Sequence, residues 1–381
     1  MPGAIAPGVE VAVRVGFVGW RGMVGSVLME RMREEGDFTG LQPTFFSTSS
    51  PGAVGPDVGA GPTELLDAGD LDALSRQDVV VTCQGSDHTL AVLPALRARG
   101  WRGSWVDASS ALRMEPDAVL VLDPVNGEAL EEAIRSGART FVGANCTVSL
   151  MLMGLVGLIR TGRVEWISSM TYQAASGAGA GPMTELVRQM RALGDATGPL
   201  LNASAAALDI DRAVATTLRA PAFPTDGIGA PLAASALPWI DRAVEDGQTR
   251  EEWKAMVEAN KLLSREHDPL PIDGLCVRIG AMRCHAQALT IKLRSPMDPE
   301  EAASVIAGAH PWVEVVPNER EATLARLTPA AVAGSLQVPV GRIRRMKLGP
   351  EYLTAFTVGD QLLWGAAEPL RRVLGLLRTR G

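Results

Sequence analysis

The chain has 381 residues, of which 46% are hydrophobic and 21% are charged, so it can bury a large core and is expected to form two domains. Its net charge of −7, without a long basic run, argues against nucleic acid or an anionic membrane surface as the main partner. The four cysteines form no CxxC pair and the four histidines have no zinc-ligand spacing. These patterns argue against a metal site and a disulfide framework, and they favour a reducing cytosol. No apolar run reaches the roughly twenty residues that cross a bilayer, and residues 1–10 are expected to be a loose tail, not a signal peptide.

The first predicted element is a strand over residues 11–18, which runs into a glycine-rich turn over 16–25 and then a helix over 26–33. This order is typical of the phosphate loop of a dinucleotide-binding domain, because glycines let the backbone approach a pyrophosphate and the helix start offers N–H donors. The spacing is G-x-x-G-x-x-G, not the commoner G-x-G-x-x-G. A glycine turn that simply packs helix on strand is the alternative.

A second strand over residues 43–46 is followed by hydroxyl-bearing side chains at 47–50. NAD-specific enzymes place an acidic residue near this point to bind the ribose 2′-hydroxyl, and the sequence has none there. Thr48 and Ser49, with Arg21 from the first turn, are suited to a 2′-phosphate instead. The sequence therefore favours NADP, and a polar turn without a ligand is the alternative.

Two further apolar strands, at residues 78–82 and 105–110, flank a helix at 90–99 and indicate a parallel sheet covered on both faces. Ligands of such sheets bind beyond the carboxyl ends of the strands, which places Gln84 at the cleft. Arg113 is either a surface arginine or a phosphate clamp.

Residues 140–150 predict a strand, a tight turn and the start of a buried helix that continues through the apolar run 150–158. Cys146 falls at or beside the helix start. A thiol there lies at the positive end of the helix dipole, which favours its thiolate form. Cys146 is therefore a candidate nucleophile, and a small apolar filler is the alternative.

The later part of the chain alternates between structured and loop-like composition. A strand is expected at 166–172, a flexible glycine loop at 176–182, a helix at 183–193, an irregular surface or subunit contact at 198–238, a central strand at 286–293 and a helix-forming segment at 362–377. The last segment is suited to pack back on the first domain.

Five segments together carry a resemblance to a known family: residues 15–26, 141–150, 171–177, 278–285 and 356–365. They resemble the bacterial branch of the aspartate-β-semialdehyde dehydrogenases. The resemblance implies an α/β fold with a Rossmann-type dinucleotide-binding domain, at 11–144 plus 367–381. A second α+β catalytic and dimerisation domain, like that of glyceraldehyde-3-phosphate dehydrogenase, would span 145–366.

The implied activity is NADPH-dependent reductive dephosphorylation of L-4-aspartyl phosphate to L-aspartate 4-semialdehyde through a cysteine thioester. This step belongs to lysine, diaminopimelate, threonine, methionine and isoleucine biosynthesis, in a cytoplasmic enzyme that is expected to be a homodimer. The reaction needs a nucleophile, a proton shuttle and groups that hold anions.

The resemblance assigns these roles to individual residues. The catalytic residues would be Cys146 as nucleophile, His285 as proton shuttle and Gln173 as an orienting side chain. The substrate would be bound by Arg113, Asn145, Gln173, Glu251, Lys254 and Arg278. The cofactor would be bound by Gly19, Arg21, Gly22, Met23, Val24, Thr48, Ser49, Gln84, Ser176, Gly177 and Gln361. Residues 202–207 depart from the family, which commonly has proline where Ala203 falls.

Several of these residues have ordinary structural readings as well. A histidine in a strand is more often a core residue with satisfied hydrogen bonds than a catalyst. Without the resemblance, Glu251 and Lys254 would be interpreted as an i,i+3 salt bridge on the surface. Arg278 has the fork that grips a carboxylate. Two other functions stay open: N-acetyl-γ-glutamyl-phosphate reductase, which shares the Cys-His chemistry, and a non-catalytic dinucleotide-binding protein.

Overall fold

The computed structural model describes residues 12–59, 61–201 and 205–379, so the tail expected at 1–10 lies outside the described residues, and so does Ala203. The chain divides into two compact units. One consists of the chain up to Asn145 together with Gly365 onward, and the other is Cys146–Trp364. Within the described ranges, no helix is both long enough and apolar enough to cross a membrane.

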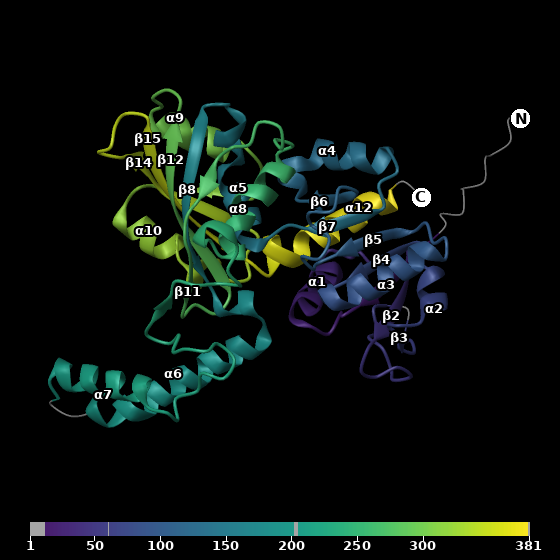
Figure 1. Ribbon diagram of the computed structural model, residues 1–381, viewed down its shortest axis with the longest axis horizontal. Helices are drawn as coiled ribbons and strands as arrows, with labels where there is room; N and C mark the ends of the chain where they lie inside the picture. The colour runs from purple at the N-terminus through teal and green to yellow at the C-terminus, as the bar shows by residue number, and fades with distance from the viewer. Residues whose placement is uncertain (1–11, 60, 202–204, 380–381) are drawn as a thin grey trace, which may run out of the picture. The chain divides into compact units, whose positions relative to one another are not determined.

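The first unit is built on a seven-stranded sheet with the order β3-β2-β1-β4-β5-β7-β6 (Figure 1). Every strand pair is parallel, which confirms the predicted parallel sheet. The elements are β1 Val13–Val18, α1 Met23–Glu34, β2 Leu41–Ser47, β3 Leu66–Asp67, α2 Leu71–Ser75, β4 Val79–Thr82, α3 Ser86–Ala98, β5 Ser104–Asp107, β6 Ala118–Val121, α4 Asp123–Arg135, β7 Thr140–Gly143 and α12 Glu368–Arg378. The strand order reverses between β1 and β4, the place where such sheets bind ligands.

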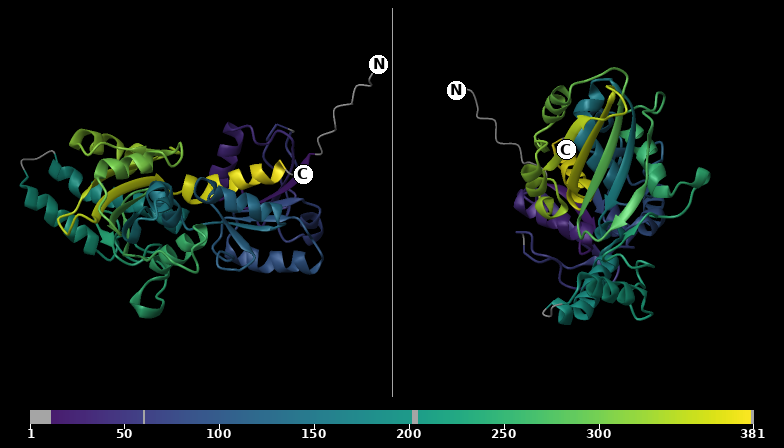
Figure 2. Two further views of the ribbon diagram at one scale, coloured as in Figure 1. Left: turned by 90° about the horizontal axis from the view of Figure 1, so that it is seen from above. Right: turned by 90° about the vertical axis from the view of Figure 1, so that its left-hand side faces the viewer.

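Helices cover both faces of this sheet, as continuous apolar strands require. All four residues of β4 and of β7 are buried. The C-terminal helix α12 contacts α1, α4 and strands β5, β6 and β7, while α3 lies on the other side of the sheet (Figure 2). Arg372 on α12 also donates to both carboxylate oxygens of Asp123 at 2.8 Å. The last helix is therefore an integral layer of the first unit.

The second unit is built on a mixed sheet with the order β13-β14-β15-β12-β8-β11-β9, and β10 pairs with β8. The elements are α5 Cys146–Arg160, β8 Val164–Gln173, α6 Ala180–Leu201, α7 Ala207–Arg219, β9 Ala236–Leu237, α8 Arg250–Leu262, β10 Ile272–Asp273, β11 Cys276–Ile279, β12 Cys284–Leu293, α9 Pro299–Ala307, β13 Val313–Val315, α10 Arg320–Arg326, α11 Pro329–Val332, β14 Val338–Arg345 and β15 Tyr352–Asp360. Short 3-10 turns lie at Ala175–Ala178 and Glu245–Gly247, and a π turn at Leu363–Ala367 precedes α12.

Helix α5 is the core of the second unit. Nearly all of its residues are buried, which is the pattern of a helix packed on every side. It contacts α8 and α9 and lies on the sheet against β8, β12, β14 and β15. The predicted central strand is confirmed, because β12 pairs with β15 on one side and β8 on the other. The N-terminus of α5 and the central strands are thus held in one rigid block.

Two sequence expectations are wrong in this unit. Residues 198–238 are not irregular throughout, because α6 runs to Leu201 and α7 follows at Ala207–Arg219. The many alanines there favour helix, and the pair α6–α7 stands away from the sheet (Figure 1). The glycine loop expected at 176–182 is also mostly helical, since a 3-10 turn ends at Ala178 and α6 begins at Ala180. Pro182 fits there because the first turn of a helix tolerates proline.

Candidate active site

Cys146 is the first residue of α5, directly after the turn that follows β7. This confirms the predicted strand, turn and helix. The thiol is half-buried, and its Sγ lies 3.3 Å from Nε2 of His285. The first N–H groups of a helix have no partner inside the helix and carry its positive dipole, so the position favours an anionic sulfur. The structure thus pairs the expected nucleophile with an imidazole.

His285 is the second residue of β12 and has no exposed surface. Its Nδ1 accepts a hydrogen bond from the backbone N–H of Ala174 at 3.0 Å. Burial and, to a smaller extent, the charge of Arg278 lower the pKa of His285 to about 3, although Glu251 opposes the shift. The ring is therefore held at both nitrogens in a dry environment.

Arg278, on β11, is 8% exposed and donates from Nη1 to the carbonyl of Ala174 at 2.8 Å. The backbone of Ala174 therefore contacts both the imidazole and the guanidinium. Burial lowers the pKa of Arg278, against the attraction of Cys146 and Glu251. A Cβ placed on Gly177 would lie 2.7 Å from Nη1 of Arg278 and 3.2 Å from Nε2 of His285. The absence of a side chain at Gly177 is what lets these two groups lie together.

Glu251 and Lys254 lie one turn apart on α8, and both are buried, so the surface-pair reading is wrong. Lys254 Nζ donates to Glu251 at 2.9 Å and to Asp241 at 3.0 Å. Although burial opposes it, these two carboxylates raise the pKa of Lys254. Gln173, at the end of β8, donates to Glu251 at 3.3 Å. Asp241, an exposed residue with positive φ that sequence reasoning missed, therefore extends this buried chain of polar groups to the surface.

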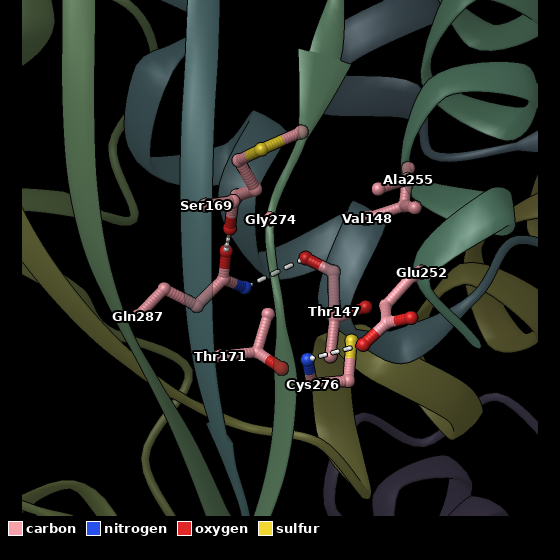
Figure 3. Close-up of a pocket in the computed structure, with 10 residues that line it drawn as sticks. Thr147, Val148, Ser169, Thr171, Glu252, Ala255, Gly274, Cys276 and Gln287 are labelled. Atoms are coloured by element: carbon pink, nitrogen blue, oxygen red, sulfur yellow. Dashed lines mark hydrogen bonds between the residues drawn. The ribbon is translucent and has the colours of Figure 1, made fainter. Parts of the chain in front are cut away.

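A second layer of hydrogen bonds lies behind the start of α5 (Figure 3). Gln287 on β12 donates to the carbonyl of Thr147 at 2.7 Å and accepts from Ser169 at 3.1 Å. Glu252 on α8 accepts from the backbone N–H of Cys276 at 3.2 Å. These residues line a cavity of about 10 Å³, which is room for about one water. These hydrogen bonds attach the first turns of α5 and α8 to the sheet. They thereby position Cys146, next to Thr147, and Glu251, next to Glu252.

In the first unit, six of the residues expected to bind the cofactor line one cavity of about 470 Å³: Gly19, Arg21, Gly22, Thr48, Ser49 and Gln84. It lies at the carboxyl ends of β1, β2 and β4. Gly19 has φ of 74°, and a Cβ on it would lie 2.6 Å from the backbone of Cys83 and Gln84, so glycine is required there. Met23 and Val24 form the first turn of α1 and do not line this cavity.

Arg21 is held in that cavity by hydroxyl groups. Its Nη2 donates to Ser47 at 2.9 Å and to Ser49 at 3.0 Å. Gln84 donates to Thr48 at 3.4 Å. No Asp or Glu is among the described residues that line the cavity, so one cation faces several hydroxyls. Such a set can hold a phosphate.

Two substrate-binding candidates also belong to the first unit. Arg113 is buried, and its Nε donates to the carbonyl of Gly143 at 2.8 Å, so it is not a surface arginine. Asn145 is buried at the end of the turn after β7. In the second unit, Gln361 donates to the hydroxyl of Ser176 at 2.8 Å, so two of the cofactor candidates contact each other.

Comparison with known proteins agrees with this arrangement. Residues 14–133 match the semialdehyde dehydrogenase NAD-binding domain, and residues 155–364 match the semialdehyde dehydrogenase dimerisation domain. The aspartate semialdehyde dehydrogenase of Francisella tularensis is 44% identical over 96% of this chain and 100% of that one, with a TM-score of 0.91. The chain belongs to the aspartate-semialdehyde dehydrogenase family. The resemblance expected from the sequence is confirmed, and so is the fold class.

More distant relatives share the fold. Aspartate semialdehyde dehydrogenase II of Vibrio cholerae, complexed with ASA, is 23% identical over 97% of this chain and 98% of that one, with a TM-score of 0.76. The enzyme of Candida albicans, with NADP, is 15% identical over 97% of this chain and 99% of that one, with a TM-score of 0.65. At these identities the two likenesses show a shared fold.

Proposed function

We propose that this chain catalyses the NADPH-dependent reductive dephosphorylation of L-4-aspartyl phosphate to L-aspartate 4-semialdehyde. The observation that carries the proposal is the pairing of Cys146 Sγ with His285 Nε2 at 3.3 Å, at the start of a buried helix. A thiol in this setting is suited to attack an acyl phosphate and hold the acyl group as a thioester. NADPH, when bound, supplies the hydride that reduces the thioester carbon.

The remaining side chains match the charges of this substrate. We propose that Arg278 grips the α-carboxylate with its fork, that Glu251 binds the α-ammonium group and that Gln173 orients the acyl group. Lys254 and Arg113 would hold the phosphate. Burial strengthens each of these contacts, because a charge removed from water interacts more strongly with its partner. Asn145, next to the nucleophile, would contact the substrate from the turn.

NADP is the proposed cofactor, and the cavity around Arg21 supports it. A guanidinium held by Ser47 and Ser49, with Thr48 beside them, suits a 2′-phosphate better than a bare ribose hydroxyl. Met23 and Val24 at the start of α1 would meet the pyrophosphate through the helix N-terminus. On the second unit, Ser176, Gly177 and Gln361 would contact the nicotinamide portion.

The proposal is tested by reduction of NADP in the presence of aspartate semialdehyde, with and without phosphate. The expected result is phosphate-dependent NADPH formation, weaker with NAD, and its loss in Cys146→Ala. N-acetylglutamate semialdehyde should be a poor substrate, which separates this activity from that of N-acetyl-γ-glutamyl-phosphate reductase. Turnover that Cys146→Ala leaves unchanged would remove the proposed mechanism, and an inactive wild-type enzyme would remove the function.

We further propose that the protein is a homodimer, through the face of the sheet opposite α5. The family match over β8, β12 and β15 is to a dimerisation domain. Met170, Ala288 and Phe356 lie side by side in register on the opposite face from buried Leu289 and Ala355. Such partly exposed apolar surface marks contact sites. Met170→Glu should lower the molar mass measured by light scattering, whereas Leu348→Glu, at another exposed position, should not.

The biosynthetic setting follows from the reaction. We propose that the product feeds the synthesis of lysine, diaminopimelate, threonine, methionine and isoleucine. A cytoplasmic location is proposed because the nucleophilic thiol must stay reduced, as it does in that compartment.

A further inference from the structure

Ser176 and Gln361, the side chains proposed to contact the nicotinamide portion, come from two segments that a third segment joins. Ser176 lies in the 3-10 turn after β8, and Gln361 directly follows β15. Two backbone hydrogen bonds, at 2.8 and 3.1 Å, attach this turn to the carbonyls of residues 281 and 282. The Ser176 hydroxyl donates a third, to the carbonyl of Arg283 at 3.3 Å. The turn is therefore fixed to the residues that lead into β12.

Asp360 fixes the segment that carries Gln361. It is the last residue of β15, and its side chain has no exposed surface. One carboxylate oxygen accepts from the backbone N–H of Leu362 at 2.9 Å, so the residue between them is held in a tight turn. The other oxygen accepts from the backbone N–H of Gly334 at 2.7 Å and lies 2.5 Å from Nε of Arg283. The residue that binds Ser176 through its carbonyl thus binds the neighbour of Gln361 through its side chain.

The ion pair between Arg283 and Asp360 is unequal in exposure. The guanidinium side chain is 30% exposed, whereas the carboxylate is fully buried. Within the described ranges, Arg283 is the one cation that pairs with Asp360. A buried carboxylate that loses its cation keeps an uncompensated charge, so the pair resists separation. Charge therefore holds the end of β15 against the start of β12.

The same contacts decide which way the amide of Gln361 faces. A carbonyl can only accept, so the Ser176 hydroxyl gives its one proton to Arg283 and must accept from Gln361. The amide nitrogen Nε2 therefore faces Ser176, at 2.8 Å. The amide oxygen Oε1 has no hydrogen-bond partner among the residues that the structure describes, although Gln361 is only 5% exposed. Nearly buried polar atoms need a partner, and the carboxamide N–H₂ group is the one donor on a nicotinamide ring.

We infer that Arg283 and Asp360 are positioning residues for the nicotinamide: they hold Ser176 and Gln361 in one arrangement, with Oε1 of Gln361 presented to the carboxamide. This inference rests on the proposed function. Arg283 acts on both contacts, because its carbonyl holds Ser176 and its side chain holds the turn of Gln361. The 2′-phosphate end of the cofactor is proposed to bind the first unit, so it does not depend on this pair.

Two ligands separate this role from a general structural one. NADPH carries the nicotinamide, and 2′,5′-ADP carries the 2′-phosphate without it. In calorimetric titrations, Arg283→Met should bind NADPH about 5- to 10-fold more weakly than wild type, as expected when one or two hydrogen bonds are weakened. Its Kd for 2′,5′-ADP should stay within about twofold. Arg320→Met is the matched control, because it removes the same charge from a side chain that is 78% exposed, and it should change neither Kd.

A double-mutant cycle shows whether Arg283 acts through Gln361. In a Gln361→Leu background, Arg283→Met should weaken NADPH binding by no more than about twofold, because the amide that the pair positions is already gone. Additive losses would overturn the inference.

The remaining outcomes are equally decisive. Asp360 keeps its two backbone donors in Arg283→Met, so the fold should survive. An unfolded variant, an equal loss for both ligands or an unchanged Kd for NADPH would each refute the positioning role. Calorimetry needs no turnover, so aspartate-semialdehyde activity of the wild-type sample keeps this failure distinct from failure of the proposed function.

Discussion

Replacing Gly177 by alanine tests how closely the site is packed around His285. The new Cβ would lie 2.7 Å from Nη1 of Arg278 and 3.1 Å from Cε1 of His285. The guanidinium must retreat by about 0.7 Å to reach the 3.4 Å of ordinary van der Waals contact. That retreat stretches its 2.8 Å hydrogen bond to Ala174. Because misplacement of reacting groups by about 1 Å can cost about 100-fold, we expect kcat/KM to fall by about 10- to 100-fold.

The fold itself should tolerate this substitution. The backbone at Gly177 lies outside the left-handed region, so alanine adds no backbone strain, and it reduces the entropy of the unfolded chain by about 0.4–1 kcal/mol. We expect the thermal midpoint to stay within about 4 °C of wild type. Gly181→Ala is the matched control, because its Cβ would meet no atom within 4 Å. Steady-state kinetics with Gly177→Ala within about twofold of wild type would refute the packing argument, as would an equal loss in the control.

Three further outcomes follow from the same geometry. A thiol reagent at pH 7, followed by mass spectrometry, should label Cys146 well before Cys276, because burial raises the pKa of Cys276 to about 12; equal labelling would contradict the nucleophile assignment. Since the folded pKa of His285 is about 3 and its ordinary value is 6.5, the unfolded chain binds more protons between these values, and stability falls as pH drops through this window. In urea unfolding, His285 alone should lower the free energy of unfolding by about 2 kcal/mol between pH 7 and pH 5, and His285→Gln should remove this part of the pH dependence. The same pH dependence of the unfolding free energy in wild type and variant would show that the ring is not held neutral. Asp241→Asn removes the ion pair with Lys254, so it should raise KM for phosphate by about 3- to 10-fold and leave kcat nearly unchanged. Asp241→Glu should restore the wild-type KM. A fall in kcat alone would contradict the role of Asp241 in holding Lys254.

Local sequence patterns were enough for the parts of the site that depend on neighbours along the chain. The glycine turn before α1, the hydroxyls after β2 and the position of Cys146 at the start of α5 each follow from one short stretch. Alternation along a strand is also a local pattern, so the strand that continues from His285 was predicted at 286–293. The resemblance to the family supplied the rest, including the roles expected of His285 and Arg278.

What the sequence could not give depends on contacts between distant segments. Ala174 reaches Nδ1 of His285 because β8 and β12 pair in a register that sets Tyr172 opposite Ala286, and that register cannot be read from either strand alone. Asp241 approaches Lys254 at the end of a segment that α6 holds in place. There the buried side chain of Gln189 accepts from the backbone N–H groups of Leu232 and Ala233 at 2.8 and 2.9 Å. Glutamine on a helix carries no sign of such a role.

The peptide unit of Ala174 has a consequence for how this enzyme can vary. The groups that hold the imidazole and the guanidinium are an amide hydrogen and a carbonyl oxygen, which every residue type except proline supplies in full. Replacing the side chain at 174 would therefore leave both hydrogen bonds in place, provided that the new side chain is small enough for this buried position. A main-chain ester at 174, made by semisynthesis, would delete the hydrogen and leave the side chain untouched. The hydrogen bonds that hold His285 and Arg278 are thus made by the main chain, and ordinary amino-acid substitutions at 174 do not remove them.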